Sequence, residues 1–417
     1  MSIIVTDQCD NLKVYHYDDG TTDRELQNIR GIIKDGDKVV CKSFGYTPEV
    51  LASDSQKLND EISPLVTTET KFFKAYEGTI LRVWQYQDIW HLSTHRKINA
   101  FKSKWGHNST YGELFCRALI PVVESIKNAE KLTTEQIIAD DLFKTFVNAL
   151  DKEKVYIFIL RSFKENRKVC NGVDEPTLYC IGSFKRDEDF KFYLDNPETF
   201  MPTPELITTI DTPDDLLDHI EKINPREYQG VVLMNPDGSS GKVVNVEYDR
   251  LDKLRGNVPN VLHRYVQLRW NKETLSQYTE LYPEHQNKFT EWETSMNHVV
   301  NNIMKKYIER YINHKTAILP PEQYKVVLEL QDYYIKNLRT KKEKATTTHI
   351  WEILGKWTER EVNVLYTQYK IRESKTGNGN RMPDEMRSGI MKSIITNYSD
   401  DANNKEEESK KDEGKKE

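Results

Sequence analysis

The hydrophobic period of the 417-residue chain changes near Tyr265, and this change limits the folds that the chain can adopt. Before it, short apolar and β-branched runs alternate with capped helical segments, whereas after it apolar residues recur at the three- and four-residue steps of a helix. We therefore predict an α+β domain at residues 1–264 and an all-α domain at residues 265–399. Residues 400–417 have almost no apolar side chains to offset the entropy of ordering, so they predict a disordered charged tail.

Composition places the chain among soluble globular proteins. Hydrophobic residues make up 37% and charged residues 30% of the sequence, and the mean hydropathy is −0.72. No stretch approaches the roughly 18 apolar residues of a membrane-spanning helix. The first residues lack the basic and apolar regions of a secretory signal, and the five cysteines include no CxxC pair. We expect no membrane partner and a cytoplasmic or otherwise intracellular location.

Charge is distributed unevenly along the chain. The whole sequence carries a formal charge of −6, which is not the overall signature of a nucleic-acid-binding protein. Residues 265–399, however, contain 21 basic and 16 acidic side chains. This basic region is compatible with a polyanion partner, and solvated helix faces would give the same count.

Turn and cap signals mark individual elements. Asp35-Gly36 between two apolar runs predicts a β-hairpin over residues 30–42. Thr133 with Gln136, and Thr212-Pro213, predict helix starts because hydroxyl side chains cap free backbone N–H groups and proline fits the first helical turn. Further strands are expected at residues 79–85, 155–160, 177–181, 230–234 and 242–246. C-terminal helices are expected at residues 289–311, 324–338 and 348–354 and after Thr358, with a break at Pro320-Pro321.

The stretch Lys74 to Thr79, KAYEGT, lies between Phe72-Phe73 and a predicted strand. A lysine here could act as a nucleophile if burial or cationic neighbours kept its amine neutral beside a bound triphosphate. Gly78 would let the backbone approach a nucleotide where a Cβ would obstruct it. The same letters also suit an exposed lysine in front of a strand, so the stretch alone does not identify a site.

Further segments follow in an order that resembles the phage-type ATP-dependent RNA ligases, a family of covalent nucleotidyltransferases. KAYEG resembles their motif I, K-x-[DE]-G, and is preceded by RGII at residue 30 and CKSF at residue 41. FKSK at residue 101 and FILRSFKENRKV from residue 158 resemble the FKSK segment and motif III. QGVV at residue 229 and KVVNVEY at residue 242 resemble motifs IV and V, and LRGN follows at residue 254. The resemblance spans residues 30–257.

The resemblance implies a ligase-type nucleotidyltransferase domain with antiparallel sheets, in which a lysine takes AMP from ATP with the help of Mg²⁺. AMP then passes to a 5′-phosphate end of RNA, and a 3′-hydroxyl displaces it to join the strands, a reaction used in RNA repair. These phosphoryl transfers depend on positioning and charge stabilisation. The implied nucleotide-binding residues are Arg30, Lys42, Glu77, Gly78, Lys104, Phe158, Arg167 and Lys242.

The reactive positions depart from the family pattern. Ala75 stands where the family has its nucleophilic lysine, three residues before Gly78, and Lys74 is the adjacent amine. The metal-binding carboxylates of motifs III and IV and the second lysine of motif V are replaced by Leu160, Gln229 and Val244. Because the nucleophile and the carboxylates that Mg²⁺ prefers are both missing, we predict that lysine adenylylation is impaired and that binding of nucleotide, RNA or both remains.

Two enzyme alternatives stay open. If Lys74 took the nucleophile's place, the chain would be an active ATP-dependent RNA ligase, although neighbouring strand residues point to opposite faces. An mRNA guanylyltransferase is less favoured, because capping enzymes and DNA ligases generally continue into an all-β domain whereas this C-terminal pattern is helical.

Overall fold

The computed structural model describes residues 3–106, 109–130, 139–161, 167–187, 189–195, 198 and 200–375. The chain forms two compact units, one that ends at Pro259 and one that begins at Asn260. The expected boundary after Arg264 falls inside helix α7 (Val261–Leu268). The difference arises because the Asn260 side chain accepts hydrogen bonds from the first N–H groups of α7, so the helix begins directly after Asn260 and not at Tyr265.

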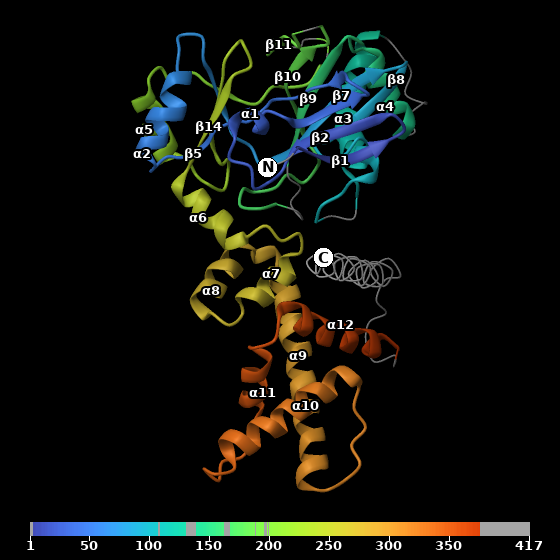
Figure 1. Ribbon diagram of the computed structural model, residues 1–417, viewed down its shortest axis with the longest axis vertical. Coiled ribbons are helices and arrows are strands. Elements are labelled where there is room, and N and C mark those ends of the chain that lie inside the picture. Colours follow the sequence, from blue (N-terminus) through green and yellow to red (C-terminus); the bar gives the residue numbers. More distant parts are fainter. Residues whose placement is uncertain are drawn as a thin grey trace, which may run out of the picture. The chain divides into compact units, whose positions relative to one another are not determined.

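The first unit contains three β-sheets in the part that the structure describes (Figure 1). Their strand orders are β1-β2-β3-β4, β11-β10-β9-β7-β8 and β12-β6-β13-β14-β5. The paired strands are antiparallel, apart from the parallel pair β14 and β5. This confirms the predicted α+β domain with antiparallel sheets. The strands are β1 (Ile3–Cys9), β2 (Leu12–Tyr17), β3 (Arg30–Asp35), β4 (Lys38–Cys41), β5 (Glu49–Leu51), β6 (Lys71–Lys74), β7 (Gly78–Tyr86), β8 (Ile89–Ser93), β9 (Lys154–Arg161), β10 (Leu178–Lys185), β11 (Phe192–Tyr193), β12 (Leu206–Ile207), β13 (Gly230–Met234) and β14 (Ser240–Val244).

The strand predictions are confirmed with small shifts at the ends. The hairpin forms between β3 and β4, and Gly36 in its turn adopts φ +57°, a conformation that glycine enters at no steric cost. Strand β14 ends at Val244 rather than at residue 246. It ends there because Asn245 turns the chain and caps helix α6 (Val246–Arg255), accepting a hydrogen bond from the Tyr248 N–H at 3.0 Å.

Helices α3 (Tyr111–Glu130) and α4 (Ala139–Asn148) cover one face of the β9 sheet. Phe115 of α3 and Phe146 of α4 pack against Phe158 of β9, with ring centroids 5.6 and 6.0 Å apart. The predicted cap Thr212 starts α5, accepting from the Asp215 N–H at 3.2 Å, whereas the pair Thr133 and Gln136 lies outside the described residues. The other helices of this unit are α1 (Arg24–Gln27), α2 (Ser55–Lys57), α5 (Pro213–Lys222) and α6.

The opposite face of the β9 sheet meets the other two sheets in a second core. Strand alternation sends Phe158 toward the helices and Ile157 into this second core. Strand β6 divides in the same way, since Phe73 joins the core between the sheets while Phe72 packs with Ile220 of α5 in a third. Alternation on these two strands therefore decides which side chains reach the space between the sheets.

The regular elements of the second unit at residues 260–375 are all helices, as predicted. The long helix expected at residues 289–311 is α9 (Gln286–Tyr307), which continues into a π-helical turn at Ile308–Ile312. Pro321 starts α10 (Pro321–Tyr333). None of the helices that the structure describes is long and apolar enough to cross a lipid bilayer. The predicted charged tail at residues 400–417 lies outside the described residues. The remaining helices are α7, α8 (Lys272–Leu281), α11 (Thr347–Leu354) and α12 (Glu359–Lys375), the last preceded by the predicted Thr358–Glu361 cap.

Candidate functional site

A cavity of about 410 Å³ lies between the sheets of the first unit. Its volume falls in the roughly 300–1,000 Å³ range of small-molecule sites. Side chains from β6, β7, β9, β10 and β13 give it apolar walls, and cationic side chains border it. The wall residues used below are Phe73, Ile80, Ile159, Ile181 and Val232, and the cations are Arg30, Lys74 and Lys242. Apolar walls suit a flat base, and the cations suit phosphate groups.

Ala75 faces this cavity directly after β6. Its N–H donates to the Gly230 carbonyl at 3.0 Å, and its carbonyl accepts from the Gln229 N–H at 2.8 Å. These bonds continue the ladder with β13, so Ala75 keeps the strand alternation and shares a face with Phe73. Ala75 is 4% exposed and belongs to the cavity wall. A longer side chain at this position would therefore point into the cavity.

Lys74 borders the cavity as well, but its amine is engaged on the other side of the strand. The Lys74 Nζ lies 2.6 Å from Glu205 Oε1 and 5.2 Å from the centre of the Tyr228 ring. Burial lowers the pKa of His219 on α5, and Lys74 is the next cause of this shift. The Lys74 charge is thus on the α5 side of β6, opposite the face that Ala75 presents.

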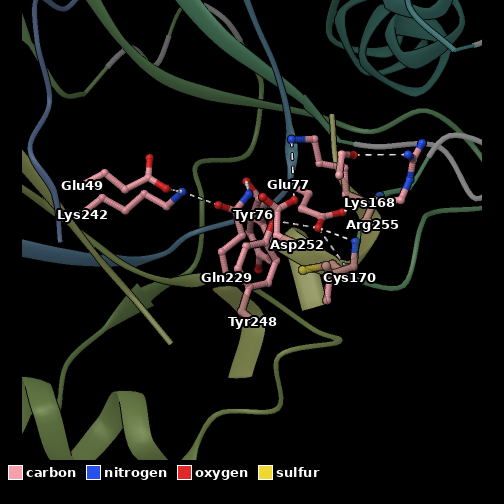
Figure 2. A network of polar contacts seen from close by, with 12 residues as sticks. Glu49, Tyr76, Glu77, Lys168, Cys170, Gln229, Lys242, Tyr248, Asp252 and Arg255 are labelled. Carbon is pink, nitrogen blue, oxygen red and sulfur yellow. Dashed lines mark hydrogen bonds and ion pairs between the residues drawn. The ribbon is translucent and has the colours of Figure 1, made fainter. Parts of the chain in front are cut away.

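Lys242 of β14 holds a polar cluster at the cavity (Figure 2). Its Nζ lies 3.1 Å from Glu49 Oε1 and donates to the Gln229 Oε1. The Gln229 Nε2 donates to the Tyr76 carbonyl at 3.3 Å. Since Gln229 is neutral, the carboxylate facing Lys242 is that of Glu49, whose side chain is 60% exposed. Gln229 and Lys242 therefore both lie at the cavity, and the nucleotide contact expected of Lys242 stays a prediction.

Glu77 is buried away from the cavity wall and joins three segments of the unit (Figure 2). Its carboxylate accepts hydrogen bonds from the backbone N–H groups of Lys168, Val169 and Cys170 at 3.1, 2.7 and 3.0 Å. It also accepts one from the Tyr248 hydroxyl at 2.9 Å. Burial, followed by Glu77 itself, raises the pKa of Tyr248, so this hydroxyl stays a donor. The predicted nucleotide contact of Glu77 needs correction, because its acceptor sites already face these four donors.

Gly78, the first residue of β7, has no room for a side chain because β9 lies close to it. A Cβ at this position would lie 2.4 Å from the Leu160 carbonyl oxygen and 2.7 Å from Ile159 Cγ1. Gly78 also borders the cavity. The close approach that requires glycine is thus the one between two strands, and the expected approach to a nucleotide is not needed to explain it.

The predicted positions of Phe158 and Leu160 also need correction. Both side chains are buried in the core under α3 and α4, on the face of β9 that turns away from the cavity. Ile159 points the other way and lines the cavity together with Ile181 of β10. These two residues were missed, although the period-two alternation of a strand was the signal that separates them from Phe158.

Three predicted cations lie away from the cavity wall. The Lys42 Nζ is 6.0 Å from the centre of the Phe190 ring, and Lys104 is exposed after a short 3-10 turn. Arg167 is 6% exposed and donates to the Val169 carbonyl at 3.2 Å. Residues 162–166, which belong to the segment that resembles motif III, are outside the described residues. The structure therefore does not bring these three side chains to Ala75.

Arg30 stays at the cavity, beside a histidine that the motif comparison did not identify. His95 lines the cavity, and burial, then Arg30, then Arg82, lower its pKa to about 3. Gly31 has φ +70°, and a Cβ there would lie 2.5 Å from the His95 carbonyl oxygen. The RG pair of the upstream segment thus places one cation at the cavity and lets the chain pass close to a neutral histidine.

The residues at the cavity do not fit a resident divalent metal. Mg²⁺ prefers several oxygen ligands, most often carboxylates. Among the described residues, the cavity wall contains one carboxylate, Glu49, which is already paired with Lys242. Within the described residues no three His, Cys, Asp or Glu side chains form a group that could hold a metal ion. The Leu160 position lies in the core and the Gln229 position carries a neutral amide.

The sequence matches no family model. It is 25% identical over 331 residues to an immediate-early protein ICP-46 homolog of Invertebrate iridescent virus 6, covering 75% of this chain and 69% of that protein. The homolog of Invertebrate iridescent virus 3 is 26% identical over 353 residues, covering 82% and 72%. The immediate-early protein ICP-46 of Frog virus 3 is 23% identical over 249 residues, covering 58% of each chain. These names state no enzymatic activity.

Similar solved structures are ligases, and the similarity is weak. A putative ATP-dependent DNA ligase from Aquifex aeolicus has a TM-score of 0.34 at 10% identity, covering 89% of this chain and 76% of that one. An archaeal ATP-dependent RNA ligase has a TM-score of 0.37 at 9% identity, covering 67% and 66%. A Naegleria gruberi RNA ligase mutant with AMP and Mn has 0.33 at 11% identity, covering 50% and 57%. An assignment to the ligases therefore depends on the motif order and the site geometry.

Proposed function

We propose that this chain is an RNA-ligase-like protein of the nucleotidyltransferase type that binds an adenine nucleotide and RNA without forming a lysine adenylate. The observation that carries the proposal is the placement of Ala75. The family resemblance assigns the nucleophile to this position, and Ala75 lies on the cavity face of the chain. A methyl group has no electron pair with which to attack a phosphorus atom.

The remaining cavity chemistry supports nucleotide binding. Ile159 and Ile181 offer apolar surface for a base, and Arg30 and Lys242 offer charge for phosphate oxygens. Arg30 has no ion-pair partner among the residues that the structure describes, so its guanidinium is available to an anion. RNA enters the proposal through the resemblance and through the basic excess of residues 265–399.

The absence of a carboxylate set among the described cavity residues has a consequence for metal use. We expect nucleotide binding to persist in excess EDTA, because Arg30 and Lys242 rather than a protein-bound ion face the phosphates. Equilibrium titration of ATP with and without Mg²⁺ measures this. Binding that disappears when the metal is removed would contradict it, whereas no binding under either condition would contradict the nucleotide site itself.

The decisive experiment is covalent labelling. The full chain is incubated with α-labelled ATP or GTP and a divalent metal, denatured, and separated on a gel. We expect no retained label, because the amine is missing at Ala75 and the metal carboxylates are missing as well. Label that appears with ATP and vanishes in Lys74→Ala would establish the alternative, an active ATP-dependent RNA ligase. Label from GTP would favour the guanylyltransferase, and strong labelling that survives Lys74→Ala would remove the motif I assignment.

A further inference from the structure

A second hollow of about 320 Å³ lies in the first unit on the other side of the chain segment that follows β6. It shares Lys74 and Tyr76 with the larger cavity, whereas Ala75, Gln229 and Lys242 are absent from its wall. We infer that this hollow is a phosphate-binding site that takes free phosphate or the phosphate monoester of a larger ligand. The inference does not depend on the proposal that the larger cavity binds a nucleotide.

The charge around the hollow supports an anionic ligand. Arg161, Arg226 and Lys74 line it, together with the carboxylate of Glu227. Lys74 is paired with Glu205 at 2.6 Å, so its charge is partly balanced. The Arg161 guanidinium has no carboxylate partner among the residues that the structure describes. A planar guanidinium forms paired hydrogen bonds to phosphate oxygens, which makes Arg161 the expected principal contact.

The Arg161 side chain and the backbone that carries Arg226 are already held in place. The Arg161 guanidinium carbon lies 4.5 Å from the centre of the Tyr76 ring, and that ring stacks on Tyr179 with centroids 5.1 Å apart and planes at 17°. The backbone at Arg226 is fixed because the Arg226 carbonyl accepts a hydrogen bond from the Asn171 N–H at 2.6 Å. Less side-chain freedom is therefore lost when a ligand binds, which favours affinity.

The segments that meet at the hollow are distant in sequence. Lys74 ends β6, Arg161 ends β9, and Arg226 follows α5. Tyr228, which is buried, closes one side and bonds to His219 at 3.2 Å between the hydroxyl and Nε2. None of these cations belongs to the set that the ligase motifs assign to the nucleotide, so the hollow is a separate candidate site.

The test is phosphorus NMR of inorganic phosphate added to the full chain. We expect the phosphate line to broaden with the wild-type protein, and Arg161→Gln and Arg226→Gln to weaken the affinity by about tenfold or more, the effect of losing one charge-assisted contact. Arg161→Lys should recover part of the loss because it restores the charge without the planar fork. Arg117→Gln is the matched control, since Arg117 lies on α3 and pairs with exposed Glu175 at 2.7 Å. Thermal melts establish that each variant is folded.

Two further measurements identify the source of the phosphate and show which of the two cavities binds it. A 5′-phosphorylated oligoribonucleotide that displaces phosphate better than its 5′-hydroxyl counterpart identifies a strand end, and phosphate that neither displaces identifies the free ion. Both results support the site. Phosphate binding that is lost in Arg30→Gln but unchanged in the Arg161 and Arg226 variants would place the ion in the larger cavity and overturn the inference. Absence of any phosphate binding would overturn it as well.

Discussion

At the scale of single residues, substitutions at Ala75 distinguish two explanations for the missing lysine. Either the whole reactive site has been lost, or only this one residue is altered. Ala75→Lys alone should restore little labelling from ATP, because Gln229 and the apolar residues of β9 give no help with the charge of the triphosphate. Adding Gln229→Glu and Ile159→Glu should restore more, since both side chains line the cavity. The measurement is retained label on a denaturing gel. Full labelling by Ala75→Lys alone would show that the rest of the site is intact and that the natural chemistry is close to that of a ligase.

The control for this series is the neighbour of Ile159. Leu160→Glu corresponds to the motif III glutamate by sequence counting, but Leu160 is 3% exposed and packs under α3 and α4. A carboxylate there would be buried without a partner, so this variant should unfold at lower temperature and give no labelling. The comparison is made with Ala75→Lys and Gln229→Glu also present. A stable protein with Leu160→Glu that labels better than the one with Ile159→Glu would contradict the described register of β9.

Glu77 should matter for stability. Its carboxylate faces three backbone N–H groups and the Tyr248 hydroxyl, so Glu77→Ala leaves four donors, three of them buried, without their acceptor. We expect the free energy of unfolding to fall by about 3–5 kcal/mol. Glu69→Gln is the control, because Glu69 is exposed and a surface change of this kind costs at most about 0.5 kcal/mol. Urea denaturation of both variants measures the difference, and equal midpoints would contradict the role assigned to Glu77.

At the scale of elements, the pairing of β7 with β9 shapes the cavity. Gly78→Ala should destabilise the protein by about 2 kcal/mol and weaken nucleotide binding, because the new Cβ pushes against the Leu160 carbonyl and Ile159. Gly20→Ala is the matched control, since a Cβ at Gly20 meets nothing within 4 Å. Thermal melts and ATP titrations of the two variants measure the effect. A Gly78→Ala protein that melts and binds like Gly20→Ala would show that the strands separate without cost.

The same strands show what could be predicted from the sequence. Apolar runs and turn residues were sufficient to predict β7, β9, β13 and the Asp35-Gly36 hairpin, because these signals are local. The side chains that line the cavity, in contrast, come from segments that are distant in the sequence. Family motifs assigned Phe158 to the nucleotide. Strand alternation separates Phe158 from Ile159, but only the pairing of β9 with its neighbours shows which of the two faces meets the cavity. Glu49 reaches the cavity through the pairing of β5 with β14, and His95 lies in a loop close to Gly31. Both contacts join segments that are distant in the sequence.

At the scale of the whole molecule, the change in hydrophobic period predicted two units, and the boundary moved only to the cap of α7 at Asn260. The motif-like segments end by Asn257, so the elements around the cavity belong to the first unit. The basic excess belongs to the second. Nucleotide binding and the proposed RNA contacts are thus assigned to different parts of the chain, which makes them separable by experiment.

A fragment that ends at Pro259 should bind ATP about as tightly as the full chain and bind RNA more weakly. The first unit has its own buried cores and contains the wall of the larger cavity, whereas phosphate contacts from the second unit would be lost. Fluorescence anisotropy with a labelled oligoribonucleotide, repeated over a range of salt concentrations, measures the affinity for RNA. The affinity of the full chain should fall as salt rises, and more steeply than that of the fragment. A soluble fragment that binds RNA as tightly as the full chain at each salt concentration would show that the second unit does not contribute to RNA binding. A fragment that aggregates or fails to bind ATP would show that the helices of the second unit serve to cover the first unit.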